Sequence, residues 1–184
     1  MPRSIFPSFV LLLGLCGASS ASDSRGIWID VPFVEQTRDG CGAAVIAMVM
    51  QYWEHAQGKP PAPAADARRI LGALAPGQSR GIYASQMANY FNRNGFRTFA
   101  FSGSEQDLHD HLSKGRPLII ALKPGAGLPL HYVVVAGLDS DQHVVLLNDP
   151  AQRKLLKEED GRVEREWKAA DHWTLLALPE PGGR

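Results

Sequence analysis

Cysteine is scarce in this chain of 184 residues, and charge of either sign is not in excess. Lys and Arg together number 19, as do Asp and Glu, and no stripe of basic residues is interleaved with aromatics. This balance excludes the usual signature of a nucleic-acid-binding protein. A long hydrophobic run is also missing. The apolar stretch at residues 6–15 is too short to span a bilayer comfortably, and no longer one follows it.

The N-terminus has the pattern of an export signal. Arg3 supplies a positive charge, residues 6–15 supply the apolar stretch, and small residues follow as far as Ala21. We therefore expect residues 1–21 to be a signal peptide that is cleaved after Ala21. Residues 22–184 then form a single domain, and a chain of that length buries about 70% of the surface that its unfolded form exposes.

Two other interpretations of the N-terminus stay open. The stretch that ends at Cys16 is close to a lipoprotein signal, which would leave a lipid anchor on that cysteine, although Leu15 stands where a small residue is usual. An uncleaved interfacial anchor is the other alternative. All three predict an exported protein, periplasmic or secreted, with no integral membrane segment after signal removal. If Cys16 leaves with the signal, Cys41 has no disulfide partner within the chain.

The order of the predicted elements indicates an α+β fold. Pro32 keeps the stretch 27–34 extended. Ser104 is interpreted as the N-cap of a helix, and Asp39 as the cap of the Cys41 helix. Residues 154–168 are highly charged and are interpreted as the solvated face of a strand or helix, with no chemistry of its own. Periodicity predicts helices at 41–54, 65–74, 84–93 and 105–112, and strands at 96–101, 117–122, 132–138, 144–148 and 173–178. We expect the N-terminal helices to pack on a C-terminal antiparallel sheet.

Cys41 is the candidate nucleophile. It precedes a strongly apolar helix pattern at residues 43–52, so we expect it at or next to a helix N-terminus. There the peptide dipoles and the free N–H groups favour the thiolate, which is the reactive form. A free thiol is a liability in an oxidising compartment, and this argues that it is kept for chemistry. The alternative is a small buried apolar side chain, which is a common fate of an unpaired cysteine.

His131 and Asp149 are the candidate partners of this thiol. His131 opens an apolar strand and Asp149 closes the next, so a hairpin around Ser140 brings both to one end of the sheet. We predict about 3 to 4.5 Å between the Cys41 sulfur and a His131 ring nitrogen. Asp149 should lie within about 3.5 Å of the other ring nitrogen. The alternative is a strand-end histidine followed by an ordinary turn.

The remaining histidines are rival bases. They lie in polar or helical surroundings that predict exposure, and they are His55, His109, His111, His143 and His172. His109 and His111 are closely spaced, but alternate residues of a helix point to different sides and no further ligands are visible. We therefore expect neither a metal site nor a cofactor.

Four segments resemble those of a known family. They occur in the same order and with compatible spacing, and they are Val31–Gln36, Asp39–Ala44, His131–Gly137 and Asn148–Pro150. These segments are similar to the motifs of C39-like cysteine peptidases in the papain-like superfamily. The resemblance runs from about Ile27 to Leu178 and is closest to the stand-alone exported members.

The resemblance implies a role for each of four residues. Cys41 is the nucleophile, His131 the general base and acid, Asp149 the residue that orients His131, and Gln36 the side chain of the oxyanion hole. Gln36 precedes Cys41 by five residues, where the peptidase domains of bacteriocin exporters usually have six. The chain also lacks the fused transporter of those domains, which argues against cleavage of double-glycine leaders on the cytoplasmic side.

The predicted function is hydrolysis of peptide, isopeptide or amide bonds through an acyl-Cys41 intermediate, with a peptide or protein as substrate. Two alternatives stay open. The acyl group could pass to an amine instead of water, which would make the protein an acyl or peptidyl transferase. The fold could also serve as a catalytically degenerate binding module, because a fold alone does not determine function.

Overall fold

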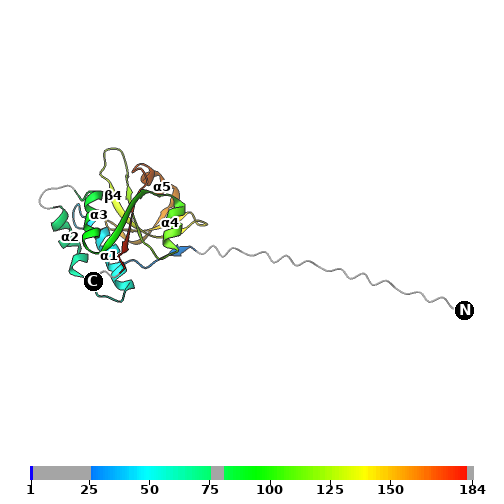
Figure 1. Cartoon of the computed structure of the whole chain (residues 1–184). Helices are drawn as coiled ribbons and strands as arrows, with labels where there is room; N and C mark the ends of the chain where they lie inside the picture. The colour runs from blue at the N-terminus through cyan, green and yellow to red at the C-terminus, as the bar shows by residue number, and fades with distance from the viewer. Residues whose placement is uncertain (2–25, 76–80, 182–184) are drawn as a thin grey trace.

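The computed structural model describes residues 26–75 and 81–181, together with Met1 (Figure 1). Seven strands form one sheet in the order β2-β7-β3-β4-β5-β6, and β1 pairs with β4 beyond the end of β3. All the neighbouring strands run antiparallel. The strands are β1 (Ile27–Trp28), β2 (Phe96–Ser102), β3 (Leu118–Leu122), β4 (His131–Asp139), β5 (Val144–Asp149), β6 (Arg153–Glu159) and β7 (Trp173–Pro179).

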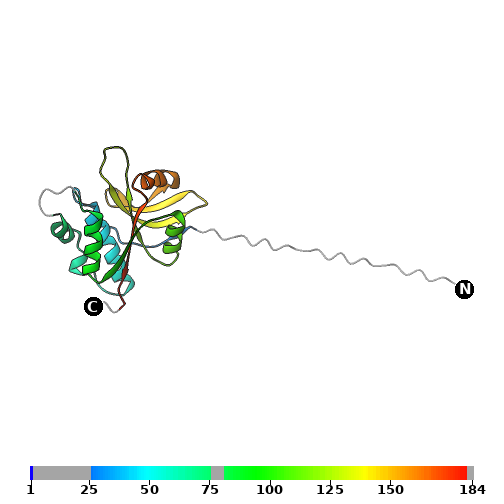
Figure 2. The same ribbon diagram turned by 45° about the horizontal axis from the view of Figure 1, so that its top comes forward.

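Helices cover both faces of the sheet. Figure 2 shows the first three helices gathered on one side and the last two on the other. They are α1 (Cys41–Ala56), α2 (Ala67–Leu74), α3 (Ala84–Arg93), α4 (Glu105–Leu112) and α5 (Asp160–Lys168). A short 3-10 helix, Pro63–Ala65, precedes α2.

The alternation of side chains along β4 separates two hydrophobic cores. Tyr132 and Val134 belong to the core under α1, whereas Val133 and Val135 belong to the core under α4 and α5. Every residue of α1 from Gly42 to Met50 is buried. A helix that is apolar on all sides is a core helix, and α1 lies between the sheet and the other two helices of its side. The N-terminus of α1 is thereby fixed against the sheet.

The α+β class predicted from the sequence is confirmed, as are the helices at 84–93 and 105–112 and the hairpin around Ser140. Ser104 caps α4 as predicted, because its hydroxyl accepts a hydrogen bond from the Asp107 amide. The second helix begins at Ala67 instead of residue 65, since the Asp66 side chain accepts from the Arg69 amide at 2.9 Å and acts as the N-cap.

The predicted cap of the first helix was wrong. Asp39 does not cap α1: the N-cap is Gly40, no side chain caps this end, and Asp39 adopts a positive φ of 56°. Residues 154–168 form most of β6 and all of α5, and most of them are not buried, as predicted. They place Leu156, Val163 and Trp167 in the buried interior.

The predicted signal peptide and Cys16 lie outside the described residues. No helix in the described ranges is long and apolar enough to cross a membrane.

A close approach of two strands requires glycine at position 137. A Cβ there would lie 2.8 Å from the Ile27 carbonyl oxygen and 2.9 Å from the Cβ of Trp28. Real Cβ atoms do not come that close to other atoms, so β1 could not reach β4 beside a larger residue. The chain from β1 then runs along the sheet, where the Ile29 amide donates to the Ala136 carbonyl at 2.8 Å.

Asn148 fastens this N-terminal segment to the sheet. Its side chain is fully buried, donates to the Val31 carbonyl at 3.0 Å and accepts from the Leu155 amide at 2.9 Å. The side-chain amide of Asn148, a residue of β5, thus joins this strand to β6 and to the stretch that leads to α1. A buried polar group left without its partner costs about 1–3 kcal/mol.

We expect Asn148→Ala to lower the free energy of unfolding by about 2–4 kcal/mol, because it leaves both the Val31 carbonyl and the Leu155 amide unpaired. Urea denaturation followed by circular dichroism measures this change. The matched control is Gln106→Ala, which removes only an exposed hydrogen bond to Asp110. Equal effects of the two substitutions would show that Asn148 does not hold the segment.

Candidate active site

Cys41 is the first residue of α1 and is half-buried. Gly40, just before it, is buried in a tight turn in which its amide donates to the Thr37 carbonyl at 2.9 Å. A Cβ on Gly40 would lie 3.0 Å from that carbonyl oxygen, so the turn favours glycine. No side chain caps the helix, which leaves the amides of its first turn directed toward the thiol. This end of the helix therefore attracts negative charge.

The pKa of the Cys41 thiol is lowered from its usual value. Burial acts in the opposite direction, but hydrogen bonds from His131 and from the Tyr132 and Gly42 backbone outweigh it, together with the charge of His131. The thiolate is therefore stabilised where it faces the histidine.

His131 and Asp149 form a hydrogen-bonded pair at one end of the sheet. His131 begins β4 and Asp149 ends β5, and the antiparallel pairing of these strands brings the two together. The distance from His131 Nε2 to Asp149 Oδ1 is 2.7 Å. Because Nε2 is engaged by Asp149, Nδ1 is the ring nitrogen left to meet the Cys41 thiol, which lines the same cleft as His131.

The pKa of His131 rises to about 9. Burial of the ring would lower it, but the hydrogen bonds to Asp149 and Cys41, with the negative charges of both, more than compensate. Asp149 is buried as well, yet its pKa is lowered because its contacts with His131 outweigh desolvation. The imidazolium is thus favoured between two negative groups well above the usual pKa of a histidine.

Gln152 is a residue of the site that no sequence motif singled out. Its side-chain amide donates to Asp149 Oδ2 at 2.6 Å, while the Ala151 amide donates to Oδ1 at 2.9 Å. Asp149 therefore receives donors on both oxygens and cannot rotate away from His131. The available signal was the Asp-Pro dipeptide at the end of a strand, because an aspartate in a turn commonly bonds amides two or three residues ahead.

Gln36 lines the same cleft as Cys41 and His131. Its backbone amide donates to the Pro150 carbonyl at 2.9 Å, which ties the Gln36 loop to the turn after Asp149. Its side-chain Oε1 is buried and has no hydrogen-bond partner. No hydrogen bond from its side-chain nitrogen is found within the described part of the chain, so this amide is available to a ligand in the cleft.

The cleft has a volume of about 720 Å³, and its lining differs from one part to another. Arg38 and Asp39, shortly before Cys41 in the chain, supply a charged part. The loop that leads into β4 supplies an apolar wall, where Leu128 and Leu130 are 55% and 45% exposed. Such large exposed apolar side chains at a concave site indicate a surface that a ligand covers.

None of the other five histidines lines this cleft. His143 bonds Asp160 and His172 bonds Glu164, both at 2.9 Å. The predicted exposure was wrong for His111 and His172, which are both half-buried. His111 has an unpaired Nδ1, and burial lowers its pKa. In residues 26–75 and 81–181, no three His, Cys, Asp or Glu side chains are arranged to hold a metal ion.

Solved structures with a similar fold are peptidase domains. One, described as a C39-like peptidase from Bacillus anthracis, superposes with a TM-score of 0.63 at 17% identity, over 85% of this chain and 98% of that one. The peptidase domain of Streptococcus ComA, a bifunctional ABC transporter of a quorum-sensing pathway, has a TM-score of 0.61 at 22% identity. It covers 82% of this chain and 100% of that domain.

A third similar structure is a double-glycine-motif protease from an AMS/PCAT transporter in complex with its leader peptide. Its TM-score is 0.58 at 21% identity, over 84% of this chain and 97% of that one. At these identities the likeness shows the fold alone, which is the papain-like α+β fold of C39 peptidase domains. No curated protein matches the chain. The Peptidase_C39 like family matches residues 28–174, so the chain belongs to the C39-like peptidases.

Proposed function

We propose that this protein hydrolyses peptide bonds through an acyl-Cys41 intermediate. The observation that carries the proposal is the bond from His131 Nε2 to Asp149 at 2.7 Å, in a ring that lines the same cleft as the Cys41 thiol. A nucleophile that meets a base, with that base oriented by a third group, is the arrangement of nucleophilic catalysis. The lowered pKa of Cys41 and the raised pKa of His131 both favour a thiolate–imidazolium pair.

Each group has a defined task in this proposal. The Cys41 thiolate attacks the carbonyl carbon, and the carbonyl oxygen takes up the negative charge. The tetrahedral intermediate collapses as His131 gives its Nδ1 proton to the departing amine, which leaves an acyl-thioester on Cys41. His131, now neutral, removes a proton from water, and the resulting hydroxide attacks the thioester. The carboxylic acid product leaves, and the thiolate–imidazolium pair is restored.

Gln36 and the backbone N–H of Cys41 would stabilise the oxyanion of both intermediates. The Gln36 amide has no partner within the described chain and faces the cleft. Donors that are held in place before the reaction act on the charge that develops in the transition state. The backbone N–H of Gln36 donates to the Pro150 carbonyl, so the position of this loop depends on the same turn that holds Asp149.

The apolar wall of the cleft favours a peptide that carries an apolar side chain close to the scissile bond. Leu130 immediately precedes His131 and Leu128 lies two residues before Leu130, so a side chain packed on them lies near the base. Covering apolar surface contributes about 25 cal/mol per Å². The protease of the AMS/PCAT transporter has been solved with a peptide bound, which supports a peptide as the substrate here.

We expect Cys41 to react with iodoacetamide at about pH 6 much faster than a free thiol, of which only a trace is thiolate at that pH. Asp149→Asn should slow this reaction about tenfold or more, because the pKa of His131 falls and the imidazolium that stabilises the thiolate is lost. Gln152→Ala should slow it by less, since Asp149 keeps its other donors. Mass spectrometry of the alkylated Cys41 peptide measures the rates.

Asp110→Asn is the matched control, since Asp110 also contacts a histidine and a glutamine but on an exposed helix face. It should leave the alkylation rate unchanged. If Cys41 of the unaltered protein is alkylated no faster than a free thiol, and slowly from about pH 5 to 8, the ion pair does not exist.

We expect the mature protein to cleave synthetic peptides that have leucine beside the scissile bond faster than those with glutamate there. Cys41→Ala should abolish cleavage. Gln36→Ala should lower kcat about 100- to 1,000-fold while leaving the alkylation rate of Cys41 unchanged, because the oxyanion forms only during acyl transfer. Chromatography of the products gives the rates, and mass spectrometry detects the acyl-enzyme.

Other outcomes of this assay separate the alternatives. Transfer of the acyl group to an added amine in preference to water would identify an acyl transferase. Rapid alkylation of Cys41 with no turnover and no acyl-enzyme for any peptide would contradict hydrolysis and favour a binding module.

A further inference from the structure

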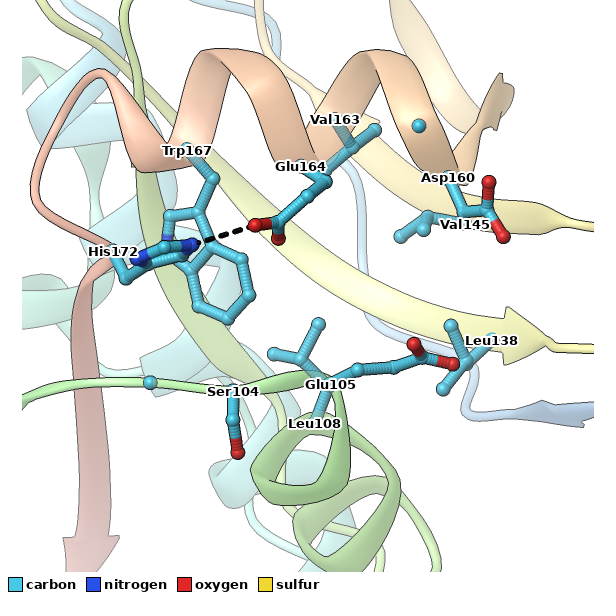
Figure 3. Close-up of a pocket in the computed structure, with 12 residues that line it drawn as sticks. Ser104, Glu105, Leu108, Leu138, Val145, Asp160, Val163, Glu164, Trp167 and His172 are labelled. Atoms are coloured by element: carbon cyan, nitrogen blue, oxygen red, sulfur yellow. Dashed lines mark hydrogen bonds and ion pairs between the residues drawn. The ribbon is translucent and has the colours of Figure 1, made fainter.

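A second pocket lies on the side of the sheet opposite α1. It opens between α4 and α5, over the ends of β4 and β5 that are distant from His131 and Asp149 (Figure 3). Leu138, which lines it, lies seven residues beyond His131 along β4, about 23 Å at the usual rise of a strand. The pocket therefore shares no residue with the candidate active site.

The inner part of this pocket is apolar. Its walls are side chains of the core under α4 and α5, namely Leu108, Leu138, Val145, Val163 and Trp167. The indole N–H of Trp167 donates to the Trp173 carbonyl at 3.2 Å, and the His172 ring meets its face edge-on with centroids 4.9 Å apart. The volume is about 460 Å³, which falls in the range of pockets that bind small groups.

Carboxylates surround the mouth of the pocket from both helices. Glu105 comes from α4, whereas Asp160 and Glu164 come from α5, and Figure 3 shows them around the space between the helices. No Lys or Arg in the described part of the chain lines the pocket. The side-chain partners of these carboxylates are a hydroxyl and two imidazoles: Ser140 for Glu105 at 3.1 Å, His143 for Asp160 at 2.9 Å and His172 for Glu164 at 2.9 Å.

The carboxylates at the mouth affect the pKa of a neighbouring histidine. The pKa of His143 is raised, first by its hydrogen bond to Asp160 and further by the charges of Asp160, Glu105 and Asp141. The basic side chain of Arg162 on the same helix pairs with Glu158 and Glu166 at 2.9 and 3.1 Å, and not with the carboxylates of the mouth. His143 thus offsets the charge of Asp160, but no Lys or Arg of the lining neutralises Glu105 and Glu164, and a cation that enters the pocket meets their negative charge.

We propose that this pocket binds the side chain of a lysine or arginine in a peptide segment of a partner protein. Such a side chain matches both the apolar interior of the pocket and its acidic mouth. Its methylene groups cover the apolar walls and its charged end stays at the mouth among Glu105, Asp160 and Glu164. The carboxylates lie on two helices that flank the opening, so a chain that crosses from α4 to α5 can direct one side chain between them. This role goes beyond the proposed hydrolysis.

The test uses acetyl-Gly-Leu-Lys-Leu-Gly-amide with the Cys41→Ala protein, so that proteolysis cannot interfere. NMR spectra should show shifts at the Gly103 and Gly161 amides and at the Trp167 indole. Glu105→Gln combined with Glu164→Gln keeps the size and the acceptors of both side chains, and should raise the Kd about fivefold or more. Asp110→Asn combined with Glu180→Gln, the matched control on exposed surface away from the pocket, should leave it unchanged.

Four results would overturn the proposal: equal binding when norleucine replaces lysine, shifts confined to the His131 cleft, no shifts at all, or a Kd insensitive to the Glu105 and Glu164 substitutions. If butylamine bound as tightly as the lysine peptide, the occupant of the pocket would not be a peptide segment. Because Cys41 is absent in every arm, none of these results bears on the proposed hydrolysis, and a failure of hydrolysis would leave this pocket unaffected.

Discussion

The hydrogen bond between His131 Nε2 and Asp149 Oδ1 is the interaction on which the candidate site depends. At 2.7 Å it holds the ring in one orientation and leaves Nδ1 for Cys41. The pairing of β4 with β5 brings the two residues together, and Gln152 holds the second carboxylate oxygen. A histidine between two negative groups favours its charged form, and that charge in turn favours the thiolate.

The sheet supports this arrangement because α1 covers one of its faces and α4 and α5 cover the other. Helix α1, buried from Gly42 to Met50, lies on one face, which places Cys41 at the end of the sheet where β4 begins and β5 ends. The side chain of Asn148, next to Asp149, donates to the Val31 carbonyl, and the backbone N–H of Gln36 donates to the Pro150 carbonyl. The segment before α1 is therefore fastened to the same turn that orients His131. The opposite face, under α4 and α5, is free to carry a separate binding pocket.

Local signals in the sequence predicted much of this structure. The periodicity of residues 84–93 and 105–112 gave both helices, and the turn residues around Ser140 gave the hairpin that joins His131 to Asp149. The errors came from tertiary context. Most of residues 154–168 are not buried, as their charges predicted, but the charged pattern did not indicate that Val163 and Trp167 lie in the core. The role of Gln152 also could not be read from its type, because it depends on how the turn after Asp149 folds back.

The central claim is that Cys41 and His131 form an ion pair stabilised by Asp149. NMR titration of the His131 ring tests it most directly, with the Cys41→Ala variant measured alongside. The account predicts that the ring of the unaltered protein stays protonated up to about pH 9. In Cys41→Ala its pKa should fall, because the thiolate is gone, but stay above the usual value since Asp149 remains. A ring that titrates near the ordinary histidine value of about 6.5 in both proteins would contradict the ion pair.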